Sequence, residues 1–168
     1  MLEGMKTGVG KFKELFLGGT KVTSTAAELN LLDGVVATTA EINRGALKKA
    51  TGALAKVDTG GGLFAWANPE ASDILVEHIA LVVGTKTNGA CSVDVGTTAT
   101  NATTLSDNLI DGQDINAAAG TFTNAANGGT NGKTAQRLAT GKWVTGSVVA
   151  GGASAGLVGT YEIYYRVL

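Results

Sequence analysis

A single histidine and a single cysteine are the residues of this sequence best suited to catalysis. His78 could transfer a proton near neutral pH, with Glu77 beside it to orient the imidazole. Neighbouring side chains of a β-strand point to opposite faces, however, so Glu77 is expected out of reach of His78. Cys91 lies in an apolar alternation, and no second histidine is present to activate its thiol. We expect both residues to be structural, with Cys91 in the core, although copies meeting on a symmetry axis could still combine their histidines.

Three short motifs resemble catalytic or binding signatures, and each lacks part of the pattern. Asp58-Thr59-Gly60 matches the aspartic-protease triplet, but two more glycines follow it, which fits an acidic linker better. Residues 127–134, NGGTNGKT, resemble a phosphate-binding loop, but asparagine stands at the first position, where the motif needs glycine. Asp107, Asp111 and Asp114 lack the spacing of a calcium-binding loop and are expected to be solvated or to cap turns. We therefore expect no enzyme, no metal ion and no cofactor.

Composition narrows the class of protein. The chain has 168 residues, a formal net charge of −1 and 16% charged residues, so it lacks the basic surface that nucleic acids require. Apolar residues never run uninterrupted for the roughly 18 positions of a membrane helix, and no secretory signal is recognisable. The 25 glycines and single proline indicate turn-rich β structure. We expect a protein made and folded in the cytoplasm, without nucleic-acid or membrane partners, in which Trp66 and Trp143 anchor the core.

Two helix-start signals stand near the N-terminus, in the stretch TSTAAELNLLDGVVATTAEIN at residues 23–43. Each has the form Thr-x-x-Glu, in which the threonine hydroxyl and the glutamate carboxylate satisfy free amides of the first helical turn. The stretch predicts helices over residues 26–32 and 39–50, which end at Asp33-Gly34 and Thr51-Gly52. These helices are too short to be stable alone. Their apolar residues are therefore candidates for attachment to another copy or another protein: Leu29, Leu31, Leu32, Ile42 and Leu47.

An alternative interpretation is a helical hairpin that folds back on the C-terminal part of its own chain. In either case the composition changes near Gly60, where helix-forming residues give way to Thr, Val, Asn and Gly. This change predicts an N-terminal helical segment at 1–57, a glycine hinge at 58–62 and a β domain at 63–168.

Period-two alternation predicts half-buried strands around 91–95 and 161–167, with further candidates at 105–110, 121–124 and 142–149. Residues 74–83 are apolar on both faces except for Glu77 and His78, which fits a central strand covered twice or a strand at a subunit interface. Ile74, Val76 and Ile79 are the candidates for that interface. Turn signals separate the strands, so we expect a mainly β protein with an antiparallel, jelly-roll-like sandwich and a short N-terminal helical segment.

The phrase TAAELNLLDGV followed by TTAEIN resembles a segment of tail-fibre, head-fibre and decoration proteins of tailed bacteriophages. The C-terminal part is also similar to small phage and prophage structural proteins, in the runs FAWANPE, CSVDVG, SDNLIDG, GKWVTGS and GLVG. Together these runs lie over most of the chain.

The resemblance implies a non-enzymatic virion protein made in the host cytoplasm, a homotrimer bound to the major capsid protein or another virion protein. Its N-terminal segment would attach to the particle, and its β domain would project. Because the chain is short for a fibre, a capsid decoration protein or short head fibre on the capsid surface is the first choice. The alternative is a receptor- or carbohydrate-binding tail-fibre protein, with Trp66 and Trp143 as the candidate sugar contacts.

Overall fold

The computed structural model of the chain describes residues 15–23, 25, 42, 45–55, 62–101, 106–149 and 154–168. The chain divides into two compact units, Met1–Thr38 and Thr39–Leu168. In the first unit, β1 (Leu15–Leu17) pairs antiparallel with β2 (Thr20–Val22). Gly18 and Gly19 join the strands with φ of 56° and 83°, a turn conformation that glycine adopts without strain. The helix predicted at 26–32 lies outside the described residues.

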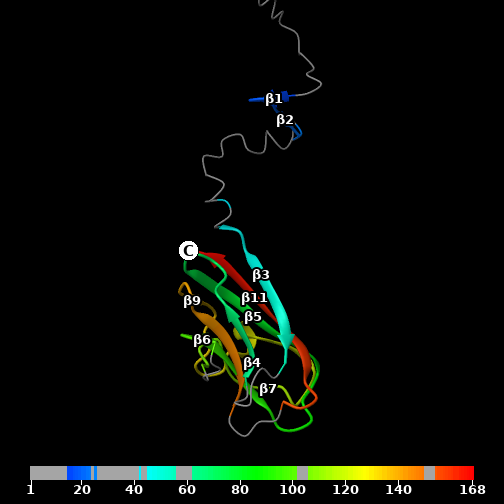
Figure 1. Cartoon of the computed structure of the whole chain (residues 1–168). Helices are drawn as coiled ribbons and strands as arrows, with labels where there is room; N and C mark the ends of the chain where they lie inside the picture. The colour runs from blue at the N-terminus through cyan, green and yellow to red at the C-terminus, as the bar shows by residue number, and fades with distance from the viewer. Residues whose placement is uncertain are drawn as a thin grey trace, which may run out of the picture. The chain divides into compact units, whose positions relative to one another are not determined.

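The second unit contains two antiparallel sheets. Its strands and one short helix are β3 (Lys48–Leu54), β4 (Gly62–Ala67), β5 (Ile74–Thr85), β6 (Ser92–Thr98), β7 (Ile110–Asp114), β8 (Gly120–Thr123), α3 (Asn124–Asn127), β9 (Gln136–Leu138), β10 (Trp143–Val148) and β11 (Val158–Val167). The four-stranded sheet has the order β4-β10-β6-β7, and the five-stranded sheet has the order β3-β11-β5-β8 with β9 also paired to β5 (Figure 1). The protein is therefore mainly β and antiparallel, as the sequence predicts.

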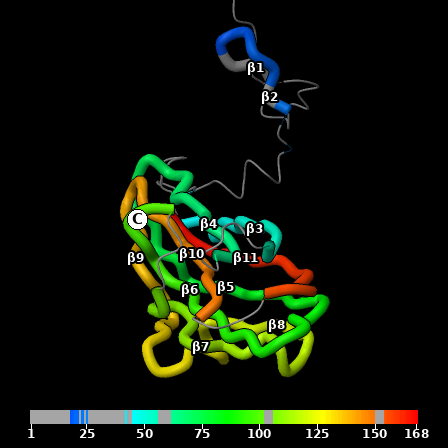
Figure 2. Tube along the Cα trace, turned by 60° about the horizontal axis from the view of Figure 1, so that its bottom comes forward, coloured from blue at the N-terminus to red at the C-terminus, as the bar shows by residue number. Residues whose placement is uncertain are grey.

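Strand pairing in this unit is nested. The first strand β3 pairs with the last strand β11, β4 pairs with β10, β5 pairs with β8, and β6 pairs with β7. The chain passes from one sheet to the other at most connections, but β6 to β7 stays within the four-stranded sheet and β8 to β9 stays within the five-stranded sheet. β7 and β8 lie at the end of the unit away from the C-terminus (Figure 2).

Both sheets contribute to one hydrophobic core. Ile163 of β11 and Val95 of β6 are fully buried in the same cluster, although they belong to different sheets. Phe64 of β4 stacks on Tyr161 of β11, with ring centroids 4.2 Å apart. Cys91 lies in this core with 3% of its surface exposed, so its predicted core position is confirmed.

Ile42 and Gly45 are helical, within the helix predicted at 39–50, but its predicted end is wrong, because β3 begins at Lys48. The boundary predicted near Gly60 is misplaced for the same reason, since β3 precedes it and belongs to the second unit. Lys48 is the first residue of β3, and Lys48 Nζ lies 2.8 Å from Glu70 Oε1, to which Tyr165 of β11 also donates its hydroxyl. Alanine, leucine and lysine favour a helix locally, but the pairing with β11 outweighs this weak preference. β3 thus lies in the unit of the sheets, and only Gly62 of the predicted hinge is described, as the first residue of β4.

The strands predicted at 74–83, 91–95, 142–149 and 161–167 are confirmed by β5, β6, β10 and β11. The strand predicted at 105–110 begins only at Ile110. Before that residue, the side chains of Ser106 and Asn108 bond to Thr97 of β6, and the amide of Leu109 donates to the carbonyl of Val95. This segment is thus held to β6 largely through side chains and not by a regular ladder. The strand predicted at 121–124 is β8, which ends at Thr123, where the Thr123 hydroxyl caps α3.

Candidate functional site

An open groove of about 370 Å³ lies on the outer face of the five-stranded sheet. It extends from the residue before β3, across β11 and β5, to β8 at the other edge. Its lining combines one apolar residue, two small residues, an imidazole, a phenol and two carboxylates: Leu47, Ala80, Thr121, His78, Tyr164, Glu77 and Glu162. The groove thus brings acidic, aromatic, hydroxyl and aliphatic groups together on one face of the sheet.

A β-bulge in β5 brings Glu77 and His78 to this groove together. Tyr164 pairs with His78 and Tyr165 pairs with Val76, so Glu77 has no partner of its own on β11. The extra residue reverses the alternation of the strand, and both polar side chains line the same groove. The expectation that Glu77 points away from His78 is therefore wrong. The sequence signal was available, since two adjacent polar residues interrupt an otherwise apolar strand.

The two carboxylates of the groove each have a cationic partner. Glu162 accepts hydrogen bonds from Lys49 Nζ at 2.7 Å and from the Tyr164 hydroxyl at 2.9 Å. These bonds, that of Lys49 first, lower the pKa of Glu162, and the same contact with Glu162 raises the pKa of Lys49. Glu77 forms an ion pair with Arg166. The formal charges of these four side chains cancel, so the groove is a polar but electrically balanced surface.

The ring of His78 lies beside the ring of Tyr164, with centroids 5.6 Å apart and planes inclined by 52°. Lys49 Nζ lies 5.4 Å from the centroid of the Tyr164 ring. Lys49, Tyr164 and His78 form one row across three strands, as their backbone pairing requires. The row fixes the aromatic pair in the groove, next to the carboxylate of Glu162.

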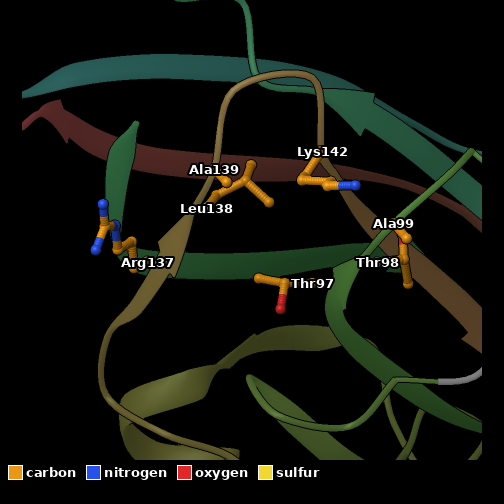
Figure 3. Close-up of a pocket in the computed structure, with 7 residues that line it drawn as sticks. All are labelled: Thr97, Thr98, Ala99, Arg137, Leu138, Ala139 and Lys142. Carbon is orange, nitrogen blue, oxygen red and sulfur yellow. The ribbon is translucent and has the colours of Figure 1, made fainter. Parts of the chain in front are cut away.

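A second opening, of about 270 Å³, lies between β9 and the end of β6 (Figure 3). It is lined by hydroxyl, small apolar and cationic side chains: Thr97, Thr98, Ala99, Arg137, Leu138, Ala139 and Lys142. Its two cations could attract an anion, but both are exposed on the surface.

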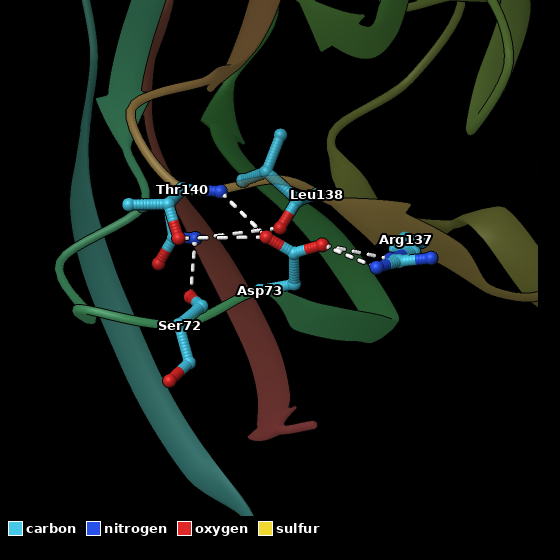
Figure 4. A network of polar contacts seen from close by, with 6 residues as sticks. Ser72, Asp73, Arg137, Leu138 and Thr140 are labelled. Carbon is cyan, nitrogen blue, oxygen red and sulfur yellow. Dashed lines mark hydrogen bonds and ion pairs between the residues drawn. The ribbon is translucent and has the colours of Figure 1, made fainter.

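Arg137 is already engaged in a structural network around Asp73 (Figure 4). Arg137 Nη2 lies 2.6 Å from Asp73 Oδ2, and the amide of Thr140 donates to Asp73 Oδ1 at 2.9 Å. Asn68 completes the link by donating to the carbonyls of Ser72 and Leu138. These contacts hold the β4-β5 loop against the β9-β10 turn, and they explain the position of Arg137 without a ligand.

Two of the five predicted attachment residues lie in the described part of the chain. Leu29, Leu31 and Leu32 lie outside the described residues. Ile42 and Leu47 are described, and they expose 50% and 59% of their surfaces. Both are thus available for contact with another molecule, and their role in attachment stays a prediction.

The predicted subunit-interface residues lie in the core. Ile74, Val76 and Ile79 each expose 0% of their surface and belong to the hydrophobic cluster between the sheets. Side chains that are covered by their own chain cannot contact another subunit, so this prediction is wrong.

Asp114 caps a turn as predicted, since it accepts from the amides of Asn116 and Ala117, two and three residues further along the chain. Asp111 accepts from the amide of Asn131, twenty residues away, and so links β7 to the loop at 127–134. Asp107 accepts from the side-chain amide of Asn131. Among the described residues, no group of three or more His, Cys, Asp or Glu side chains is arranged to hold a metal ion.

The remaining candidates also have structural explanations. The loop at 127–134 is closed by its own backbone, since the amide of Gly132 donates to the carbonyl of Gly128, and it follows the short helix α3. Burial, and then the charge of Asp114, raises the pKa of the Cys91 thiol. Trp66 packs against the core beside Tyr165, with ring centroids 5.2 Å apart. Trp143 is half-buried on β10, and Asp58 lies outside the described residues.

No protein-family model, no curated protein and no solved structure matches the chain. Within the described ranges, no helix combines the length and apolar character that crossing a bilayer requires.

Proposed function

We propose that the chain is a non-enzymatic structural protein of a tailed-bacteriophage virion, either a capsid decoration protein or a short head fibre. The sequence resemblance at residues 25–43 is the origin of this proposal. The observation that carries it is the exposure of Ile42 and Leu47, which both precede β3 in the second unit. Apolar side chains left uncovered at the start of a folded unit are suited to bind a partner.

The same proposal assigns the β unit to the jelly-roll class of sandwich. The nested pairing of β3 with β11, β4 with β10, β5 with β8 and β6 with β7 supports this assignment, since a long hairpin rolled across two sheets produces that order. The core shared by both sheets supports it too. In this arrangement the N-terminal segment attaches to the major capsid protein, and a homotrimer of β units projects from the particle.

Paired substitutions in the full-length chain test the attachment. Ile42→Asp and Leu47→Asp should each abolish co-sedimentation with virions of the encoding phage that lack the native protein. An aspartate in an apolar contact centre costs about 2 kcal/mol or more of binding free energy. Both side chains are exposed, so the unfolding temperature should stay unchanged.

Ala55→Asp provides the control, because Ala55 is also exposed, follows β3 and gains the same charge. This variant should bind particles like the wild type. Full binding by the Ile42 and Leu47 variants would refute the assignment of the attachment site, and a cryo-EM map with the chain on the tail would refute the capsid location.

A further inference from the structure

We propose that the groove on the outer face of the five-stranded sheet binds a neutral saccharide. This site contains neither of the tryptophans that the sequence offered as sugar contacts, and it shares Leu47 with the proposed attachment residues. It rests on three observations: the charge balance of the groove, the hydrogen-bonding capacity that remains in it, and the fixed positions of its polar groups.

The charge balance selects against ionic ligands. Glu162 is paired with Lys49, and Glu77 is paired with Arg166. Because both charges of each pair are already compensated, the groove offers an ionic ligand no net charge of opposite sign. A neutral ligand can enter without breaking either pair.

The hydrogen-bonding capacity matches hydroxyl groups. An ionised carboxylate offers about four acceptor positions, and the two bonds to Glu162, from Lys49 and Tyr164, leave about two of them for a ligand. The hydroxyl of Thr121, on an exposed residue of β8, can both donate and accept. Adjacent hydroxyls of a sugar can use such groups at the same time.

The remaining surface of the groove is apolar or aromatic. Ala80 lies on the strand beside Glu162, and its small side chain keeps the groove open at that position. Tyr164 and His78 supply two rings, and Leu47 supplies an aliphatic side chain. A pyranose presents a C–H face as well as hydroxyls, so it can contact rings and carboxylates together. The volume, about 370 Å³, falls within the range of small-ligand sites.

The backbone fixes these groups before a ligand arrives. The bulge at Glu77 places this residue and His78 on the groove side, where regular pairing would separate them. The bonds to Lys49 and Tyr164 hold the carboxylate of Glu162 in one orientation. Such preorganisation reduces the ordering cost of binding.

NMR titration of the full-length, isotope-labelled chain tests the proposal. The ligands are the methyl glycosides of glucose, galactose, mannose and N-acetylglucosamine. We expect at least one neutral sugar to give saturable shifts at the amides of His78, Ala80, Thr121 and Glu162, with a dissociation constant in the millimolar range. N-acetylneuraminic acid, which is anionic, should bind more weakly than that sugar.

Thr121→Trp should fill the groove from β8, where Thr121 is exposed and belongs to no core cluster. The affinity should fall about tenfold or more, which corresponds to about 1.4 kcal/mol. Thr130→Trp, at an exposed turn away from the groove, is the matched control and should bind like the wild type. Because Thr121→Trp should leave virion attachment intact, failure of this proposal and failure of the proposed function can be distinguished.

Three results would overturn the proposal. The first is the absence of saturable shifts with all four neutral glycosides, and the second is equal affinity of the Thr121→Trp variant. The third is that the NMR shifts of the groove amides change with protein concentration and not with added sugar, which would assign the groove to contact with a second copy of the chain.

Discussion

Replacement of Ile79 by alanine tests whether the inner face of β5 is a core or a subunit interface. Ile79 exposes 0% of its surface and pairs with Ile163 of β11, which is equally buried. The substitution removes three carbon atoms, worth about 0.8 kcal/mol each, or about 2.4 kcal/mol of transfer free energy. The cavity left in a core raises the loss, so we expect the free energy of unfolding to fall by about 3 to 4 kcal/mol.

Urea denaturation monitored by tryptophan fluorescence can measure this loss at two widely separated protein concentrations. The hydrogen bond that the Ile79 amide donates to the side-chain oxygen of Asn124 remains in the variant, so the loss reports on side-chain packing. Val82→Ala is the matched control, because Val82 is an aliphatic residue of the same strand that is only half-buried. This control should lose about 1 kcal/mol or less, since part of its surface is already in water.

A core position and an interface position predict different results. Loss of core packing lowers the unfolding midpoint equally at both protein concentrations, whereas loss of a subunit contact makes the midpoint depend on concentration. A concentration-dependent loss for Ile79→Ala, or a loss no larger than that of Val82→Ala, would refute the placement of Ile79 in the core.

Two further predictions concern pH and backbone packing. Hydrogen bonds from the Thr140 amide and then from Arg137 lower the pKa of Asp73 in the folded state, so its stabilising contribution is present above the unfolded pKa of about 3.9 and is lost as the pH falls through the lower folded pKa. The urea midpoints of wild type and Asp73→Asn should therefore differ at pH 7 and converge below about pH 4, and a constant difference would contradict this explanation. In Gly52→Ala, the new Cβ would lie 2.6 Å from Cε1 of Tyr161. The free energy of unfolding should therefore fall by about 1 to 3 kcal/mol, which a lower thermal midpoint would reveal. Gly45→Ala, with no atom within 4 Å of its new Cβ, is the control, and equal midpoints for the two variants would refute the packing argument.

The strands were predictable wherever one face is buried and the other is not. The alternation around Tyr161, Ile163 and Tyr165 correctly predicts the inner face of β11, since these three residues are buried and their neighbours are more exposed. Cys91 was predictable for the same reason. In these segments the local pattern and the tertiary environment favour the same conformation.

β3 could not be predicted from its own residues. Its sequence, KKATGAL, is rich in helix formers, and its stabilising contacts come from residues more than twenty positions away along the chain. The ring of Tyr161 lies directly against Gly52, so a residue that weakens a strand in isolation fits this one. The hairpin of β1 and β2 was missed for a different reason: the Gly18-Gly19 turn signal was present, but the two flanking runs are only three residues long.

The bulge in β5 accounts for both the error about the interface and the missed groove. Under strict alternation, Ile74 and Val76 lie on one face of the strand and Ile79 lies on the other, which predicts apolar partners on both sides of the strand. One extra residue at Glu77 changes the parity, and all three apolar side chains then enter the same core. The opposite face carries Glu77 and His78, which line the groove, together with Leu75, Ala80 and Val82. An apolar strand can therefore have one face in the core even when strict alternation predicts two, provided that a bulge at two adjacent polar residues shifts the alternation. The polar pair then lies on the outer face, where the groove is open to a ligand.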